Sequence, residues 1–265
     1  MSENPYSSPT TVAAIPLPGR WQYRPPHVIM VVFRTLFIAN AVLSVLATIA
    51  GALMTQLLQQ GANSPTGIAR QADIINGVLL AAFALAACQI AVSLSCIVIY
   101  CIWVYRANSN ARALGAQGMQ YSPGWAVGWN FVPFANLVVP MQVASELFYS
   151  SDPATGPTNW KSGGTPSLIG WWWGMFLGAR FSSFFFNRLS DDSNAEELLF
   201  GMMLMLLTSM ANAAACVLVI RVASTIVRRQ QEKYDRQKDD ASKGADGAEQ
   251  VPPVVNPSFV ADPKS

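Results

Sequence analysis

Four long apolar stretches, each nearly free of charge, alternate with polar segments along the chain. A helix needs about 20 consecutive apolar residues to cross a bilayer, and each stretch is close to or beyond that length. Because backbone polar groups in lipid must be bonded within their own segment, helices are the expected form of these crossings. The pattern predicts an all-α integral membrane protein, a bundle of four transmembrane helices at about residues 31–58, 74–105, 168–186 and 198–220.

A fifth charge-free run, residues 113–145, differs from the other four in its content. Pro123, Pro133 and Pro140 each lack a backbone donor, and several side-chain amides add polar groups that lipid cannot satisfy. If this run crossed, the acidic loop before the last span would become cytoplasmic and the arginines after it would lie outside, against the positive-inside rule. We therefore expect a proline-broken segment at about residues 121–150, interfacial or re-entrant, between the second and third transmembrane helices.

Arginine lies mainly on one side of the four-span topology. Arginines precede or begin the first span, follow the second and follow the last, and positive charge beside a span marks its cytoplasmic side. Both termini are therefore expected in the cytoplasm, with a membrane domain at residues 27–230 and disordered tails at 1–26 and 231–265, which are rich in proline or charge. The arginines concerned are Arg20, Arg24, Arg34, Arg106, Arg112, Arg221, Arg228 and Arg229.

Tryptophan placement supports the same topology. Indole favours the headgroup level of a membrane, because its ring is apolar and its N–H is polar. All 8 tryptophans fall on the cytoplasmic side of the four-span arrangement, whereas five spans would divide them between two faces. The expected interfacial anchors are Trp103, Trp125, Trp129, Trp171, Trp172 and Trp173.

Composition argues against several classes of function. The 265 residues are 52% hydrophobic and 12% charged, and the net charge of +2 is not concentrated on one element, so nucleic acid is not an expected partner. The 4 cysteines lie inside apolar runs and His27 is the single histidine, so we expect no metal site and no cofactor. No catalytic motif occurs, and we expect no enzyme, although Glu146 and Asp152 form a carboxylate pair that could perform acid-base work.

Polar residues near the second span and the broken segment are candidates for a functional site. Arg106 and Asn110 are four residues apart and share one side of a helix. One interpretation is a structural collar at the cytoplasmic surface, in which Glu146 pairs with Arg106 or Arg112. The other is a ligand pocket built from the same groups. The candidate polar residues are Arg106, Asn110, Arg112, Asn136, Glu146, Asp152 and Arg180.

The third span carries a ladder of small residues, Gly170, Gly174 and Gly178, which would let another helix approach closely. Packing against another span of the same chain is one interpretation, and a seam between copies of the chain is the other. Arg180 is the one charge well inside a span. It is expected to form an ion pair or to reach water near the outer surface, or else to contact an anion or substrate.

A distinctive order of residues begins at Trp103 and reads WVYRANSNARALG, followed from Tyr121 by YSPGWAVGWNFVP. Asn136, Pro140 and Glu146 continue the pattern. The chain resembles in these residues the bacterial membrane family named domain of unknown function 4328, over roughly residues 30–230. The resemblance implies a bacterial inner-membrane protein of several spans and implies no particular activity.

Two kinds of function fit these features. The favoured interpretation is a noncatalytic membrane scaffold or assembly component, with the lipid bilayer and a further copy or another membrane protein as partners. The alternative is a small transporter or lipid-handling protein that uses the broken segment, because irregular elements at membrane depth can line cavities. A dry, well-packed bundle would favour the scaffold, whereas a polar cavity would favour the alternative. The residues expected to share such a cavity are Asn40, Gln89, Arg180 and Asn212.

Overall fold

Helices make up the fold of the residues that the computed structural model describes, namely 21–62, 68–162, 164–189 and 195–249, and these residues contain no strand. The all-α fold expected from the apolar stretches is confirmed for this part of the chain. Four long helices dominate: α1 (His27–Ala62), α2 (Ile68–Ala113), α5 (Ser167–Leu189) and α6 (Ala195–Glu249).

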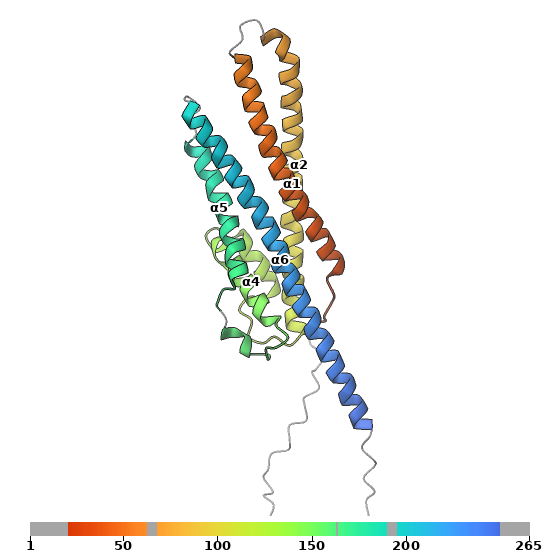
Figure 1. Cartoon of the computed structure of the whole chain (residues 1–265). Coiled ribbons are helices and arrows are strands. Elements are labelled where there is room, and N and C mark those ends of the chain that lie inside the picture. Colours follow the sequence, from red (N-terminus) through yellow and green to blue (C-terminus); the bar gives the residue numbers. More distant parts are fainter. Residues whose placement is uncertain (1–20, 63–67, 163, 190–194, 250–265) are drawn as a thin grey trace, which may run out of the picture.

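The long helices form two hairpins, α1 with α2 and α5 with α6 (Figure 1). The hairpins meet through α1 and α6, while α2 packs mainly on α1 and α5 mainly on α6. They spread apart toward the end that carries the turn between α1 and α2 (Figure 1). The helices α2 and α5 are therefore the outer members of the two hairpins and are not paired with each other.

The proline-rich run between α2 and α5 is divided into short helices, as its prolines predict. The Ser122 side chain accepts a hydrogen bond from the Trp125 backbone N–H (3.4 Å) and caps a helix that starts with Pro123. Pro140 occupies the first turn of another helix. The elements gather at one end of the bundle (Figure 1). They are α3 (Pro123–Gly128), η1 (Trp129–Phe131), η2 (Ala135–Leu137), α4 (Val139–Ser150) and η3 (Asn159–Ser162).

A glycine cap ends α2. Gly115 has φ +86°, a left-handed conformation that residues with a side chain rarely adopt. Its N–H donates to the Arg112 carbonyl (3.1 Å) and the N–H of Ala116 donates to the Ala111 carbonyl (3.1 Å). This pair of bonds is the Schellman arrangement, and it turns the chain from α2 into the loop before α3.

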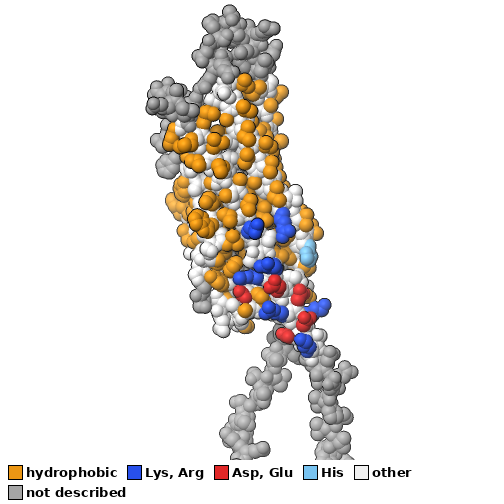
Figure 2. Space-filling model, viewed as in Figure 1, with side chains coloured by type: hydrophobic (Ala, Val, Ile, Leu, Met, Phe, Trp, Pro, Cys, Tyr) orange, Lys and Arg blue, Asp and Glu red, His pale blue; other side chains and the backbone are white. Residues whose placement is uncertain are grey.

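Three helices of the described residues are long and apolar enough to cross a membrane, over His27–Leu57, Asn76–Ala113 and Phe200–Lys243. The expectation of apolar spanning helices is thus supported at three of the four predicted positions. Figure 2 shows apolar side chains over the upper part of one face, with Lys, Arg, Asp and Glu gathered on its lower part. This separation of charge from apolar surface is what a protein partly immersed in lipid requires.

The helix α5, the fourth predicted span, is not among these three. Its 23 residues extend about 34 Å at 1.5 Å per residue, so its length is sufficient. Its composition is the difference, because Trp171, Trp172, Trp173 and Arg180 lower the mean hydropathy of the segment.

The tightest packing lies at the charged end of the bundle. The beginnings of α1 and α5, the ends of α2 and α4 and the middle of α6 bring their apolar side chains together there. Farther along the bundle the large apolar side chains are mostly exposed, as expected for residues that face lipid. The fully buried side chains at the charged end include Phe33, Trp103, Leu147, Ile169 and Ile226.

The end of α6 differs from the disordered tail expected at residues 231–265. The helix continues to Glu249, and residues 1–20 and 250–265 of the two expected tails lie outside the described residues. Charged pairs spaced one turn apart support the extension, including Arg228 with Glu232 at 3.7 Å. The first part of the extension is also packed, since Lys233 is buried and donates to the Ser150 carbonyl (3.1 Å).

Candidate functional site

The polar residues at the end of α2 hold the following loop in place. Arg112 donates from Nε to Asn108 Oδ1 (3.1 Å) and from its guanidinium to the Tyr121 carbonyl (2.9 Å). Asn108 donates to the same carbonyl (3.1 Å). Because two donors from one helix converge on one loop carbonyl, these side chains act as structural supports, and Asn108 is fully buried.

Asn110 fastens a strap, residues 21–26, that leads into α1. Its side-chain amide donates to the Arg24 carbonyl (3.0 Å) and its oxygen accepts the Arg24 N–H (3.1 Å). Next to this clamp the Tyr23 hydroxyl donates to Gln231 Oε1 (2.9 Å), and the Tyr23 ring stacks on Tyr234 at 4.5 Å between centroids. The strap therefore ties the beginning of α1 to both α2 and α6.

Titration of Tyr23 is expected to loosen this strap at high pH. Burial raises the pKa of Tyr23 from 10.0 to about 12, and the charges of Asp235 and Tyr234 add to the effect. Since the folded pKa is above the unfolded one, the contribution to stability is complete below pH 10 and is lost as the pH approaches 12. The unfolding temperature measured in detergent should therefore fall more steeply between pH 10 and pH 12 for the native chain than for Tyr23→Phe. Equal pH slopes for the two proteins would contradict the assignment.

Glu146 holds the other end of the same loop. Its carboxylate accepts the backbone N–H groups of Gln120 and Tyr121, the latter at 3.4 Å. The Tyr121 hydroxyl donates to Gln142 on α4, and burial together with the nearby Glu146 charge raises the pKa of Tyr121. The ion pair of Glu146 with Arg106 or Arg112 stays a prediction. Glu146 thus supports the collar interpretation through backbone contacts.

A group of residues that includes the candidate Asp152, together with Arg229 and Gln230, which were not among the candidates, joins the end of α4 to α6. Arg229 forms an ion pair with Asp152 (3.3 Å), donates to the Phe148 carbonyl (2.9 Å) and lies 3.8 Å above the Phe148 ring. Gln230 is fully buried and donates to the Ala107 carbonyl (2.9 Å) and to Ser151 Oγ (3.0 Å). The spacing of Arg229, Gln230 and Lys233 along one turn was the available signal, but Lys233 lies in the tail expected to be disordered and the other two residues directly precede it.

The expected interfacial tryptophans divide into two groups. Trp125 and Trp171 are exposed and Trp129 is half-buried, so they remain suited to a headgroup level. The side chains of Trp103, Trp172 and Trp173 are buried in the protein, where they contact other side chains and not a membrane surface. Trp173 also donates to the Leu137 carbonyl (2.8 Å) and so ties α5 to η2.

The glycine ladder of α5 faces open space. A methyl group added at Gly170, Gly174 or Gly178 would meet no atom within 4 Å among the described residues. Close packing of this ladder against another span of the same chain is therefore not what the structure shows.

A cavity of about 1070 Å³ lies between the two hairpins. The helices α1, α2, α5 and α6 form its walls, and η1, η2 and the start of α4 close one end. Ile97, Phe131, Phe181 and Phe184 line the cavity and are also exposed on the surface, so they mark its mouth between α2 and α5. The mouth lies among apolar side chains.

A hydrogen-bonded cluster occupies the α1 side of this cavity. Asn40 Oδ1 accepts hydrogen bonds from Gln89 Nε2 (2.9 Å) and Ser93 Oγ (2.9 Å), and the Asn40 amide donates to Cys216 Sγ (3.5 Å). One turn farther along α1, the hydroxyl oxygen of Ser44 is hydrogen-bonded to the hydroxyl oxygen of Ser209 on α6 (3.4 Å). The cluster thus joins α1, α2 and α6 in the apolar part of the bundle.

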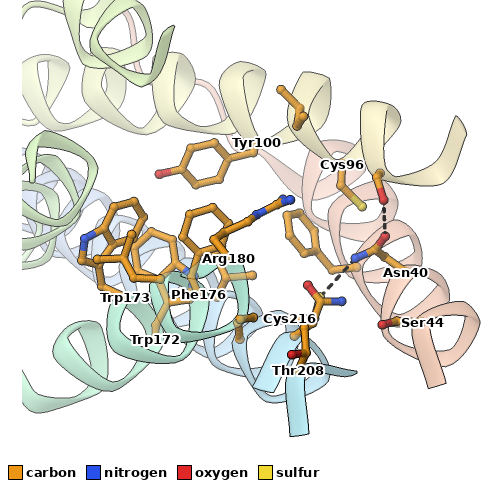
Figure 3. A pocket seen from close by; sticks show the side chains of 18 of the residues that line it. Asn40, Ser44, Cys96, Tyr100, Trp172, Trp173, Phe176, Arg180, Thr208 and Cys216 are labelled. Atoms are coloured by element: carbon orange, nitrogen blue, oxygen red, sulfur yellow. Dashed lines mark hydrogen bonds between the residues drawn. The ribbon is translucent and has the colours of Figure 1, made fainter. Parts of the chain in front are cut away.

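Arg180 lies in the same cavity. Its guanidinium carbon is 5.3 Å from the centroid of the Phe176 ring, one turn earlier on α5. Figure 3 shows Trp172, Trp173 and Phe176 at one end of the cavity, Asn40 and Cys96 at the other, and Arg180 between them. Among the described lining residues, Arg180 is the only charged one. The sequence offers Asp191, Asp192, Glu196 and Glu197 as partners for Arg180, and the side chains of all four lie outside the described residues.

The cavity brings together the four residues that the sequence analysis named as a test, namely Asn40, Gln89, Arg180 and Asn212. Asn136 lines the cavity as well, and its amide donates to the Asn130 carbonyl (3.3 Å). The analysis missed Ser44, Ser209 and Cys216. Their spacing was the signal, because each lies three or four residues from Asn40 or Asn212 and therefore on the same helix face.

Comparison with known families settles the relationship of the chain. A family model described as "Domain of unknown function (DUF4328)" matches residues 66–228. The chain belongs to this family. The DUF4328 region includes α2, the short helices, α5 and α6 as far as Arg228, and so it contains most of the cavity. The helix α1, which contributes Asn40, precedes the matched residues. The chain matches no curated protein and no solved structure.

Proposed function

We propose that this DUF4328 protein is a multi-pass membrane protein that holds a lipid-like molecule in the cavity between its hairpins, as a small transporter or a lipid-handling protein. The observation that carries the proposal is the cavity shared by Asn40, Gln89, Arg180 and Asn212. A scaffold explains the packed collar but needs no cavity, because tightly packed helices would serve it better. The proposed role is binding without catalysis.

The proposed topology has four spans, with α5 as the fourth. The length of α5 and its pairing with α6 along the bundle support this assignment, since a helix bound to a spanning partner shares its depth. The charged end, with the collar and both ends of the described chain, is assigned to the cytoplasm of a bacterial cell by the positive-inside rule. The lipid bilayer is then the principal partner.

The collar has a supporting role in this proposal. It holds the closed end of the cavity, because Trp173 binds the Leu137 carbonyl and Glu146 binds the loop that leads to α3. Phe134 is 85% exposed and has φ +62°, a strained conformation for a residue with a side chain. An exposed apolar tip of this kind suits insertion into the inner leaflet beside the cavity.

Filling the cavity is expected to remove the bound molecule. Ala47 lines the cavity from α1, and Ala47→Trp places a large ring in the space. Ala84 is exposed on α2 and is absent from the cavity wall, so Ala84→Trp is the matched control. Native mass spectrometry of protein purified in mild detergent should detect a co-purified amphiphile on the native chain and on Ala84→Trp, with at least about tenfold less on Ala47→Trp.

Equal amounts of bound amphiphile on Ala47→Trp and on the native chain would contradict the proposal, since binding would then lie on the outer surface. Unfolding temperatures measured on the same samples serve as the folding control. If Ala47→Trp does not fold, Leu177→Trp is measured in its place, because Leu177 lines the cavity from α5. Retention of the amphiphile by a folded Leu177→Trp protein would also count against the cavity.

A further inference from the structure

We propose that the cavity takes an anionic amphiphile, whose phosphate or carboxylate headgroup binds the guanidinium of Arg180 while its hydrocarbon chains leave between α2 and α5. This inference rests on the proposed function, because it names the ligand class of the same cavity. It adds the sign of the charge, the residue that binds it and the direction of the chains.

Arg180 places a positive charge in the cavity. The described lining residues include no carboxylate, and the guanidinium lies over the neutral ring of Phe176. A charge inside an apolar bundle is unfavourable unless an opposite charge or water accompanies it. The planar fork of arginine presents paired N–H groups that match two oxygens of a phosphate or a carboxylate. An acidic headgroup therefore satisfies the site, whereas a cation would be repelled.

The Arg180 side chain is directed back along α5. Side chains of an α-helix lean toward its N-terminus, and Arg180 accordingly lies against Phe176, one turn back along α5. Arg180 shares the cavity wall with Cys216, the residue that accepts a hydrogen bond from Asn40. In Figure 3 the guanidinium lies between the aromatic side chains that include Phe176 and the side of the cavity that carries Asn40 and Cys96.

Asn212 adds a neutral polar side chain to the same cavity as Arg180. It lines the cavity from α6, and its side chain makes no hydrogen bond within the described part of the chain. A neutral amide and a cation in one cavity suit a headgroup that carries ester or hydroxyl oxygens besides its charge. The cavity therefore offers one charged donor and a separate neutral group at the depth where the polar cluster lies.

An apolar route leads from this site to the surface. Tyr100, Trp172 and Phe176 form an aromatic wall, and Ile97 and Phe181 stand at the exposed mouth between α2 and α5. Hydrocarbon chains that pass from an apolar wall into lipid remain out of contact with water along the whole route. A free inorganic anion has no use for such a wall, so the shape favours an amphiphile over a soluble phosphate.

The test compares two lipids that share their acyl chains but differ in whether they carry an acidic headgroup. The purified full chain is mixed with equal amounts of phosphatidylglycerol and of diacylglycerol, which lacks the phosphate, and the bound lipid is measured by native mass spectrometry. The native chain should favour phosphatidylglycerol by about tenfold or more, because diacylglycerol offers no anionic oxygens for charged hydrogen bonds with the guanidinium. Arg180→Gln should remove the preference, and Arg180→Lys should keep part of it. Arg221→Gln alters an exposed arginine outside the cavity wall and should change nothing.

Each outcome bears on one idea or both. In one outcome, Ala47→Trp removes lipid binding, but the binding shows no headgroup preference and is unchanged in Arg180→Gln. This outcome would overturn the anionic headgroup and leave the proposed function standing. Absence of any lipid binding sensitive to Ala47→Trp would overturn both. Palmitate that displaces phosphatidylglycerol would support the common chemistry of an acidic headgroup on an apolar chain. Displacement by inorganic phosphate at equal concentration would overturn the amphiphile, since the site would then bind a free anion.

Discussion

Trp103→Ala is expected to lower the free energy of unfolding by about 3–5 kcal/mol, the range for removal of a large aromatic ring from a core. Trp103 is 1% exposed. The centroid of its ring lies 5.6 Å from the ring centroid of Phe33 and 6.0 Å from that of Tyr100. These contacts join α1 to α2 where the packing is tightest. Removal of the indole leaves a cavity that the surrounding long helices cannot close without moving their backbones.

Trp125→Ala provides the matched control, because the sequence assigns Trp103 and Trp125 the same interfacial role. Trp125 is 59% exposed, so its replacement should change the unfolding free energy in detergent by less than about 1 kcal/mol. Denaturant unfolding of both variants in the same micelles measures the difference. Losses of similar size for the two tryptophans would show that the end of α2 does not pack as described.

The two tryptophans illustrate what the sequence could and could not predict. Preference for a membrane surface follows from the indole itself, but burial depends on which helices pack around it. The run Trp171 to Trp173 makes the same point, since successive residues on a helix differ by about 100° and cannot all face lipid. The structure turns Trp171 outward and buries Trp172 and Trp173. Local sequence gives the composition of the collar, whereas tertiary packing decides its orientation.

Apolar length was the most dependable signal for the fold. It located α1, α2 and α6 because helices that must be bonded internally need long apolar runs, and prolines correctly divided the segment between α2 and α5. The extension of α6 to Glu249 was not foreseen, because its charged composition is compatible with either a helix or a tail. Contacts with Ser150 and Tyr23 favour the helix, and neither contact can be inferred from local sequence.

The candidate site was predictable in part for a similar reason. Asn40, Gln89, Arg180 and Asn212 attract attention because polar groups are rare in apolar helices, and the structure collects all four around one cavity. Arg106, Arg112, Glu146 and Asp152 attract attention through charge, yet those whose contacts are described hold backbone or neighbouring side chains. A residue's type indicates that it needs a partner, but not whether the partner is a ligand or the protein.

Asn110→Ala is expected to release the strap that leads into α1, with a loss of about 2–3 kcal/mol in unfolding free energy. Asn110 is fully buried and supplies both a donor and an acceptor to the Arg24 backbone, so alanine leaves two polar groups without their partners. The strap has few other backbone bonds available, since Pro25 and Pro26 carry no N–H. Opening of the strap should therefore precede unfolding of the rest of the protein.

Hydrogen exchange at the Arg24 amide measures this opening directly, because that N–H donates to Asn110 Oδ1 in the folded protein. Its exchange should accelerate by about tenfold or more in Asn110→Ala, while amides in the middle of α2 keep their protection. Tyr23→Phe removes only the neighbouring hydroxyl contact with Gln231 and should produce a smaller change. If the Arg24 amide exchanges at the native rate in a folded Asn110→Ala protein, the clamp does not hold the strap. If exchange rises equally throughout α1, the strap and the cavity wall that it leads into open as one unit, which would make Asn110 a determinant of the cavity as well as of the collar.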